Sequence, residues 1–143
     1  MASATSGFGT LLQRGNAASP EVFTTLAEVV TIGGPTLSTE LIDVTNHSSA
    51  SNHREKIASL KDGGEVTFTV NYLPANATHS GSAGILLDWI NRTNRNWKVV
   101  WTDSGTTTWP FTGVVTGFTP NAPIDDKLSA DVTIGITAAV TPV

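Results

Sequence analysis

The sequence predicts a mainly β fold, either a β-sandwich or a strongly bent sheet, with one flanking α-helix. Two segments, 65–72 and 128–137, alternate strictly between apolar and polar residues, which is the period of a half-buried strand. One segment, 80–91, instead spaces its large apolar residues along one face of a helix. Because turn residues recur between other short β-branched runs, we expect about six or seven strands in a single domain, 1–143.

The N-terminal segment, 1–20, is rich in Ala, Ser, Gly and Thr. Two interpretations stay open. The segment is either a frayed terminus or an extended arm that docks on a neighbouring chain through Phe8, Leu11 and Leu12.

Three strands are predicted in the next part of the chain. The first, 22–32, ends at the breaker Gly33-Gly34-Pro35. The second, 37–44, shifts its apolar phase between Leu41 and Ile42, as a β-bulge requires. The third, 64–73, is closed by Pro74, which cannot donate to a ladder.

A long polar loop, 45–62, joins the second and third of these strands, and Ile57 and Leu60 are its large apolar residues. Loops of this length are uncommon in compact domains and are usually functional or disordered. Ordering it costs on the order of 20–30 kcal/mol of backbone entropy, whereas burying those two side chains returns about 3–6 kcal/mol. We therefore expect the loop to become ordered only against another chain.

The rest of the chain contains the predicted helix and three further strands. The helix, 80–91, has Ser80 or Ser82 as its cap and presents Ile85, Leu86, Trp89 and Ile90 to the sheet. Strands follow at 97–101, 106–118 and 128–137, with a hairpin turn at Asp103-Ser104-Gly105. The tail, 138–143, is short, and it is a candidate for a second arm.

Composition excludes several classes of function. The 143 residues carry a formal net charge of −4, which argues against a protein that grips nucleic acid by neutralising phosphates. The chain has no cysteine, so neither a disulfide nor a thiolate is expected. It contains no apolar run long enough for a membrane helix and no pattern of a secretory signal at its N-terminus.

No motif predicts catalysis, a metal site or a cofactor. His47 and His53 lie in the predicted loop, and a zinc site needs a third, fixed ligand. Asp125-Asp126 lies in a Pro-rich turn, where nothing separates the two pKa values as an acid–base pair requires. Three in-phase tryptophans predict core or interface packing, with a monomeric carbohydrate-binding β-sandwich as the alternative: Trp97, Trp101 and Trp109.

Two motifs are specific to one protein family. The first is a strand–IDVT–loop–SLKDGGEV–strand unit in 37–72, in which Ser59 replaces a glycine of the family pattern, and the second is the turn GFTPNAPIDDKL in 117–128. With them, residues 20–137 resemble the major tail tube protein of bacteriophages with long, flexible, non-contractile tails. The resemblance is weaker to tube proteins of contractile injection or type VI secretion-like systems.

The resemblance implies a structural virion protein rather than an enzyme. Such proteins are made in the host cytoplasm and form hexameric rings that stack into the tail tube, with one sheet of each subunit joining a ring-wide β-barrel. The tube surrounds a tape-measure protein, ends at tail terminator and tip proteins, and conducts double-stranded genome DNA into the host cell without binding it specifically.

The resemblance also assigns expected roles to residues. The loop 45–62 is expected to contact the next ring, through Asn46, His47, His53, Arg54, Glu55, Lys56, Ile57 and Leu60. The polar rows of the two regular strands contain no lysine or arginine, which suits a channel for DNA because lumen-facing bases would retain phosphates. The lumen candidates are Glu65, Thr67, Thr69, Asp131 and Thr133, with bulk solvent or an adjacent subunit as the alternative surroundings.

Overall fold

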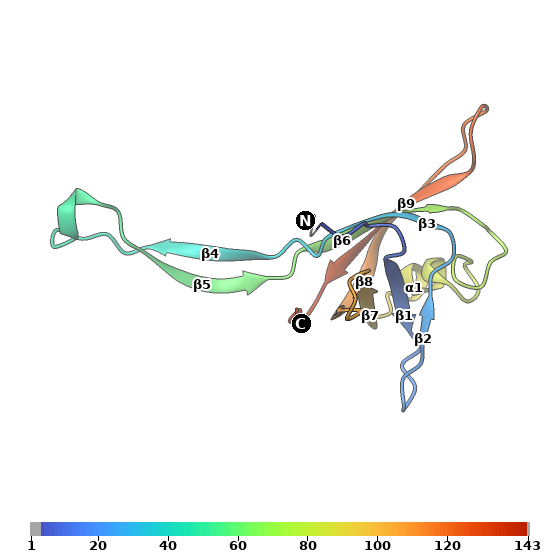
Figure 1. Ribbon diagram of the computed structural model, residues 1–143, viewed down its shortest axis with the longest axis horizontal. Helices are drawn as coiled ribbons and strands as arrows, with labels where there is room; N and C mark the ends of the chain where they lie inside the picture. The colour runs from blue at the N-terminus through green and yellow to red at the C-terminus, as the bar shows by residue number, and fades with distance from the viewer. Residues whose placement is uncertain (1–3, 143) are drawn as a thin grey trace.

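The structure, a computed structural model, describes residues 4–142 and is mainly β, as predicted. Seven antiparallel strands form one sheet in the order β2-β1-β7-β8-β9-β6-β3, and two more form a separate hairpin, β4-β5 (Figure 1). The strands are β1 (Leu11–Gly15), β2 (Phe23–Thr25), β3 (Val29–Gly33), β4 (Ser38–Asp43), β5 (Lys56–Asp62), β6 (Glu65–Asn71), β7 (Arg95–Val100), β8 (Thr108–Asn121) and β9 (Ser129–Ile136). A 3-10 turn (Ala50–Asn52) and the helix α1 (Ile85–Asn91) complete the described elements.

The sheet bends at β8, which belongs to two layers. The first half of β8, from Thr108 to Gly113, pairs with β7, whereas the second half, from Gly113 to Asn121, pairs with β9. A register shift between Val115 and Gly117 marks the bend. The layer β2-β1-β7 therefore faces the layer β9-β6-β3, and β1 comes into contact with β3. The bent single sheet, one of the two predicted forms, is the one observed.

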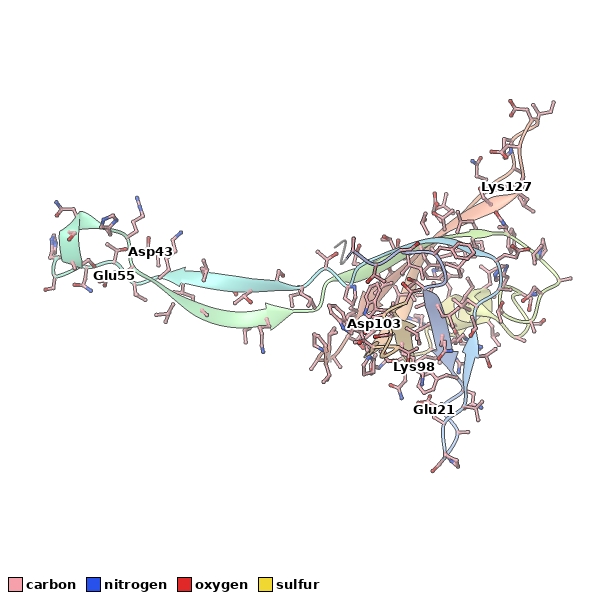
Figure 2. All side chains as sticks on the ribbon, viewed as in Figure 1. Glu21, Asp43, Glu55, Lys98, Asp103 and Lys127 are labelled. Atoms are coloured by element: carbon pink, nitrogen blue, oxygen red, sulfur yellow. The ribbon has the colours of Figure 1, made fainter. Side chains whose placement is uncertain are left out.

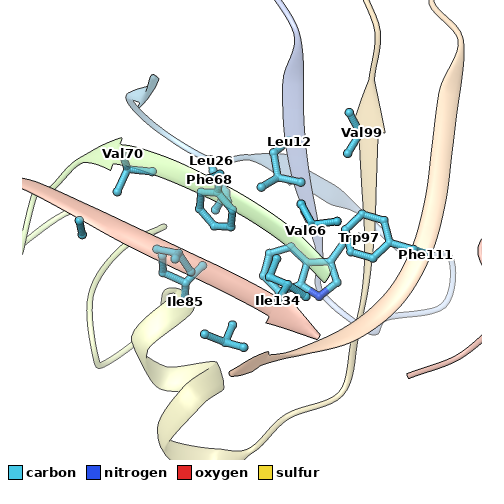
Figure 3. Close-up of a cluster of buried hydrophobic side chains, with 13 residues drawn as sticks. Leu12, Leu26, Val66, Phe68, Val70, Ile85, Trp97, Val99, Phe111 and Ile134 are labelled. Carbon is cyan, nitrogen blue, oxygen red and sulfur yellow. The ribbon is translucent and has the colours of Figure 1, made fainter. Parts of the chain in front are cut away.

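The core lies between the two layers, and the segments of strict alternation supply most of it (Figure 3). Val66, Phe68 and Val70 of β6 are at most 3% exposed, and Val132 and Ile134 of β9 oppose them. The remaining buried apolar residues are Leu12, Leu26, Ile85, Trp97, Val99, Phe111, Val115 and Ala130.

The tryptophans pack within the molecule, as the core interpretation predicts. Trp97 is fully buried and donates its Nε1–H to the Gly113 carbonyl at 3.2 Å. Trp101 and Trp109 are half-buried and pack edge to face on each other, with ring centroids 5.5 Å apart.

The N-terminal arm prediction is wrong for Leu12, whereas the contact of Leu11, whose side chain is 38% exposed, stays a prediction. Residues 11–15 form β1, an internal strand between β2 and β7, and Leu12 is fully buried in the core. Phe8 alone of the three predicted contacts lies outside the sheet, and it is 94% exposed. The segment 1–3 lies outside the described residues.

The predicted loop 45–62 is wrong in its second half, because Lys56–Asp62 forms β5 and pairs with β4. Side chains on both faces of β5 are exposed, so the strand lacks the alternation that burial of one face imposes. The predicted bulge between Leu41 and Ile42 is wrong, because these two residues pair in regular register with Ala58 and Ile57. The register shifts instead between Thr39 and Leu41, where β5 carries the extra residue. The predicted strand 22–32 is likewise two strands, divided by a turn in which Glu28 has a φ of 56°.

The helix is shorter than predicted, and a different side of it faces the sheet. It begins at Ile85, its N-cap is Gly84, and no serine side chain caps it. Ile85 and Asp88 are buried, whereas Trp89 and Ile90 of the predicted stripe are 51% and 57% exposed. The sheet side of the helix is thus partly charged, which a hydrophobic pattern cannot indicate.

Candidate assembly surfaces

The most exposed feature of the molecule is β4-β5 with its connecting turn, residues 38–62, which we call the projecting hairpin. It extends far from the bent sheet along the longest axis of the molecule (Figure 1). Its two strands pair with each other, and Ile42 lies opposite Ile57. Neither strand pairs with a strand of the seven-stranded sheet. An isolated two-stranded ribbon is marginally stable in water, so this one lacks the support that each strand of the body receives.

Aliphatic side chains on the projecting hairpin are exposed to an extent that is unusual for a segment of a monomer. None of the residues 38–62 is buried. Contiguous exposed apolar surface of this kind marks an interaction site. The large apolar residues of the hairpin are Leu41 (59% exposed), Ile42 (44%), Val44 (39%), Ile57 (52%) and Leu60 (76%).

The tip of the hairpin is held by local polar contacts, and Asp43 and Glu55 lie at its base (Figure 2). Asp43 accepts hydrogen bonds from the Thr45 N–H at 2.9 Å and from Arg54 Nη1 at 3.1 Å. Glu55 donates its N–H to Thr45 Oγ1 at 2.8 Å. Hydrogen bonding from the Thr45 side chain, and then from its backbone, holds the pKa of the Asp43 carboxyl below its ordinary value. The tip therefore has a defined conformation although it is far from the core.

The predicted contact residues of the loop divide between this tip and β5. Asn46 orders the turn by accepting the Ser48 N–H at 2.8 Å. His47 and His53 are exposed. Among residues 4–142, no three His, Cys, Asp or Glu side chains are arranged to hold a metal ion. The others, Lys56, Ile57 and Leu60, project from β5.

A second surface, the polar face, consists of the outward side chains of β6 and β9. Thr67 lies directly opposite Thr133, and Thr69 lies opposite Asp131. Thr69 Oγ1 donates to Asp131 Oδ1 at 2.8 Å. The structure thus brings these four candidates together on one face, and Glu65 continues the row on β6.

Two flanking strands extend the polar face in ways that the sequence did not indicate. Thr31 of β3 is paired with Thr69, and Thr119 of β8 is paired with Asp131, so both share this face. Lys98 on β7 belongs to the other layer, where its ammonium lies 4.0 Å from the centre of the Phe23 ring. Its attraction to the ring keeps that charge on β2.

A buried ion cluster connects α1 to the sheet, and sequence reasoning missed it. Asp88 is fully buried and accepts hydrogen bonds from Arg14 Nε and Arg95 Nε, both at 2.5 Å. Arg95 also donates to the Gly15 carbonyl at 3.2 Å. The one available signal was a single acid inside an otherwise apolar helical run, ILLDWI. Such a cluster is strongly destabilised when one partner is removed.

Other ionisable groups of the body have structural partners or lie in solvent. His79 is buried, accepts the Leu73 N–H at Nδ1 (3.1 Å) and donates from Nε2 to the Ala27 carbonyl (2.7 Å), so both ring nitrogens are used. Asp125 and Asp126 lie exposed at the turn between β8 and β9. Asp103 organises the predicted hairpin turn by accepting the Thr107 hydroxyl at 2.6 Å, and this bond holds the pKa of its carboxyl low.

The body has two further surfaces with exposed apolar side chains. A groove of about 930 Å³, the N-terminal groove, runs between residues 5–12, 25–32 and 101–103, and Phe8 and Val30 are exposed along it. Its charged lining residues are Glu28 and Asp103, both acidic. The second surface, the helix patch, consists of the exposed Trp89 and Ile90 of α1. No helix within the described residues is long and apolar enough to cross a membrane.

Solved structures similar to this chain include assemblies from a particle tail and from injection systems. The tail of an empty gene transfer agent particle, refined with C6 symmetry, superposes with a TM-score of 0.78 at 14% identity, covering 98% of this chain and 99% of that chain. A sheath/tube terminator structure of an extracellular contractile injection system gives 0.69 at 13% identity, covering 99% and 97%. The sheath-tube complex of such a system gives 0.65 at 13% identity, covering 99% and 93%. No curated protein matches the sequence.

The family itself is identified from the sequence. Residues 8–141 match the family model described as lambda phage tail tube protein. That range includes the bent sheet, the polar face and the projecting hairpin. The chain therefore belongs to the lambda phage tail tube protein family, and it is a structural tail tube protein of a phage-like particle.

Proposed function

We propose that this chain is the major tail tube subunit of a particle with a long, flexible, non-contractile tail, and that it forms hexameric rings which stack into a tube. The observation that carries the proposal is the projecting hairpin, a ribbon with exposed aliphatic side chains and no partner strand in the body. Burying roughly 1,000 Å² of apolar surface is worth about 25 kcal/mol, and that is the size of a specific protein–protein interface.

Ring formation is supported by two free strand edges. Within residues 4–142, the outer edge of β3 has no partner strand, and neither has the outer edge of β8 beyond Gly113, where its pairing with β7 stops. Between these edges lie four antiparallel strands, β3, β6, β9 and the second half of β8. An even number of strands lets rotation about a ring axis join the edges of neighbouring copies in antiparallel fashion, and closure removes the edges altogether. The result is a ring-wide β-barrel.

In such a barrel the polar face lines the lumen. Glu65, Thr67, Thr69, Asp131 and Thr133 then form a wall of hydroxyl groups and carboxylates, without a base on β6 or β9. Phosphates would find no counter-charge there, so double-stranded DNA could pass without being retained. The tape-measure protein inside the tube and the tail terminator and tip proteins at its ends are the further proposed partners.

A contractile apparatus is the second candidate, because tubes and tube terminators of contractile injection systems share the fold. The outer surface would then bind a sheath. Co-expression with the sheath protein of a contractile system, followed by co-purification, distinguishes the two. A stable sheath–tube complex would favour the contractile assignment.

The proposal is tested by negative-stain electron microscopy of the concentrated, purified protein. We expect tubes of uniform width. The matched variant replaces residues 38–62 with a short Gly-Ser turn, which the adjacent ends of the paired Ser38 and Asp62 allow. It retains the whole core, so it should stay folded and give rings or monomers but no tubes. Tubes from this variant, or featureless monomers from the intact chain at any concentration, would contradict the proposal.

The lumen assignment has a separate test. Replacing Glu65 and Asp131 together with lysine should leave tubes intact but slow DNA ejection and lower infectivity, because the new bases would hold phosphates. The matched control, Glu65→Gln with Asp131→Asn, removes the same charges without adding positive ones and should eject DNA normally. Unchanged ejection by the lysine variant would show that these residues do not face the channel.

A further inference from the structure

The N-terminal groove and the helix patch lie at the two free strand edges of the body. Residues 29–32 of β3, the edge strand on one side, line the groove. On the other side, α1 packs against β8. Asp88 of α1 binds Arg95, which pairs with Gly113, the position where β8 leaves β7 and its free edge begins. Each free edge therefore has one of the two surfaces beside it.

Both surfaces also lie on the core side of the layer formed by β3, β6, β9 and the second half of β8. Ile85 of α1 is fully buried in the core (Figure 3), so the helix is on the side of this layer opposite to the polar face. Leu12 of the facing layer lines the groove, which places the groove on that side as well. When the edges of two neighbouring copies pair, the layer continues from one copy to the next, and its core side continues with it. The helix patch of one copy is thereby brought toward the groove of its neighbour.

The apolar side chains of the two surfaces suit each other. Trp89 and Ile90 project from the helix patch, and each is more than half exposed. Phe8 is 94% exposed along the groove, and Val30 is 49% exposed. The groove, at about 930 Å³, has the size of clefts that enclose a large bound group. Aromatic side chains that fill such a pocket contribute much of the binding energy of an interface.

The charges at the two surfaces are opposite in sign. The charged residues that line the groove are the acids Glu28 and Asp103. Arg92 follows the helix patch at the C-cap of α1 and is exposed. The acid of this helix, Asp88, is buried between two arginines, so it does not offset the charge of Arg92 at the surface. A basic aromatic patch thus faces an acidic apolar groove, which favours a second copy of this chain as the occupant.

We propose that, within a ring, the helix patch of each copy inserts into the N-terminal groove of its neighbour and places Arg92 beside Glu28 and Asp103. The inference rests on the proposed function and specifies the contact that joins neighbouring copies in addition to the paired strand edges. Every copy uses its groove on one side and its helix patch on the other, so a closed ring leaves neither surface in water. Phe8 then has the role of an arm contact between neighbours.

Cross-linking tests this contact without changing the side chains that form it. Gly7→Cys places a thiol in the groove lining, where no heavy atom lies within 4 Å of the Cβ position, and Asn91→Cys places one beside Ile90 at an exposed position. The chain has no cysteine of its own, so a short bifunctional maleimide added to tubes of the double variant reacts at these positions. We expect a ladder of linked chains on a denaturing gel that ends at the hexamer, because a lateral contact closes within one ring. The control pair, Gly7→Cys with Ile124→Cys at the exposed turn between β8 and β9, should give no such ladder.

A charge reversal gives an independent measurement. Arg92→Glu places a like charge against Glu28 and Asp103 and should raise the concentration needed for assembly by about tenfold or more, because facing like charges repel. Adding Glu28→Arg to this variant should restore assembly. Arg92 is exposed, so the unfolding free energy of the monomer should stay the same. Assembly of Arg92→Glu at the concentration that suffices for the intact chain would overturn the contact.

The outcomes of cross-linking separate this inference from the proposed function. Tubes of the cysteine double variant without any ladder would overturn the lateral contact and leave the tube assignment standing. A ladder that continues beyond six chains would also overturn it, because such a ladder joins copies of different rings. If the intact chain forms no tubes at all, the proposed function fails, and the lateral contact fails with it.

Discussion

β5 and β6 are consecutive strands, separated by Gly63 and Gly64, and they have very different surroundings. Three side chains of β6 are buried in the core, whereas no residue of β5 is buried. Both strands pair in antiparallel fashion, but β6 has a partner on each edge, β3 and β9, whereas β5 pairs with β4 alone. What differs is whether the apolar side chains find contacts within the chain: those of β6 do, whereas those of β5 stay exposed. The comparison teaches that one domain can contain a part that buries its own apolar side chains and a part that leaves them exposed in a single copy.

The strongest way to break the body is to remove a charge from its ion cluster. Asp88→Asn leaves Arg14 and Arg95 without their counter-ion, and each is at most 16% exposed at the side chain. We expect a loss of about 3–5 kcal/mol in the free energy of unfolding, measured by urea denaturation. Asp126→Asn, at an exposed turn, is the control and should change it by less than about 0.5 kcal/mol. A similar small loss for Asp88→Asn would mean that the cluster is not structural.

The junction between the two parts should be intermediate in its effect. Gly64 has a φ of +68°, and a Cβ there would meet the Thr36 carbonyl oxygen of the facing segment. Gly64→Ala should therefore cost about 1–3 kcal/mol in unfolding free energy. Gly7→Ala is the matched control, since no heavy atom lies within 4 Å of its Cβ position. Equal stability of the two variants would show that the junction rearranges freely.

A substitution on the hairpin should spare the fold and block assembly. Ile57 is 52% exposed, so Ile57→Ser should change the unfolding free energy of the monomer by less than about 0.5 kcal/mol. The yield of tubes, measured by sedimentation, should nevertheless fall by about tenfold or more. The reason is that every subunit of a ring loses the same Ile57 contact. Ile57→Leu keeps the apolar surface and should polymerise. Normal tubes from the serine variant would remove the distinction between the two regions.

The smallest expected effect is a local one, at the hairpin tip under acid. The pKa of Asp43 is lowered in the folded state, first by the Thr45 side chain and then by its backbone N–H. The stabilisation of the tip by the hydrogen bonds to the Asp43 carboxylate is therefore present above the ordinary aspartate pKa. It is lost as the pH falls through the lowered pKa. Amide exchange at Thr45 should accelerate in that acid range, while amides of β6 stay protected. In Asp43→Asn, exchange at Thr45 should be fast already at neutral pH; slow, pH-independent exchange would argue against the contact.

The sequence predicted those elements whose two faces differ in their surroundings. β6 and β9 alternate because one side of each contacts the core and the other faces outward, and the polar face was identified from the same alternation. The position of those two strands side by side follows from long-range pairing, which periodicity does not encode. The family resemblance then assigned a role to the face, although Thr31 and Thr119 were not recognised as parts of it.

Elements without such asymmetry were missed, for two physical reasons. β5 has similar surroundings on both faces, so its residues show no period of two. β1 is only five residues long, and of its side chains Leu12 enters the apolar core while Arg14 turns to Asp88. The helix was placed with the wrong side inward because hydrophobicity counts Asp88 as a surface residue, whereas two arginines from other strands make its burial favourable. Each of these depends on partners distant in the sequence.

The long strand β8 has a mechanical consequence. The single strand Thr108–Asn121 belongs to both layers of the sheet, because it pairs with β7 near its start and with β9 toward its end. A shear force that tries to slide one half past the other is thus carried by covalent backbone and not only by interdigitated side chains. We therefore expect that a subunit under force deforms as one body and that its two layers do not separate.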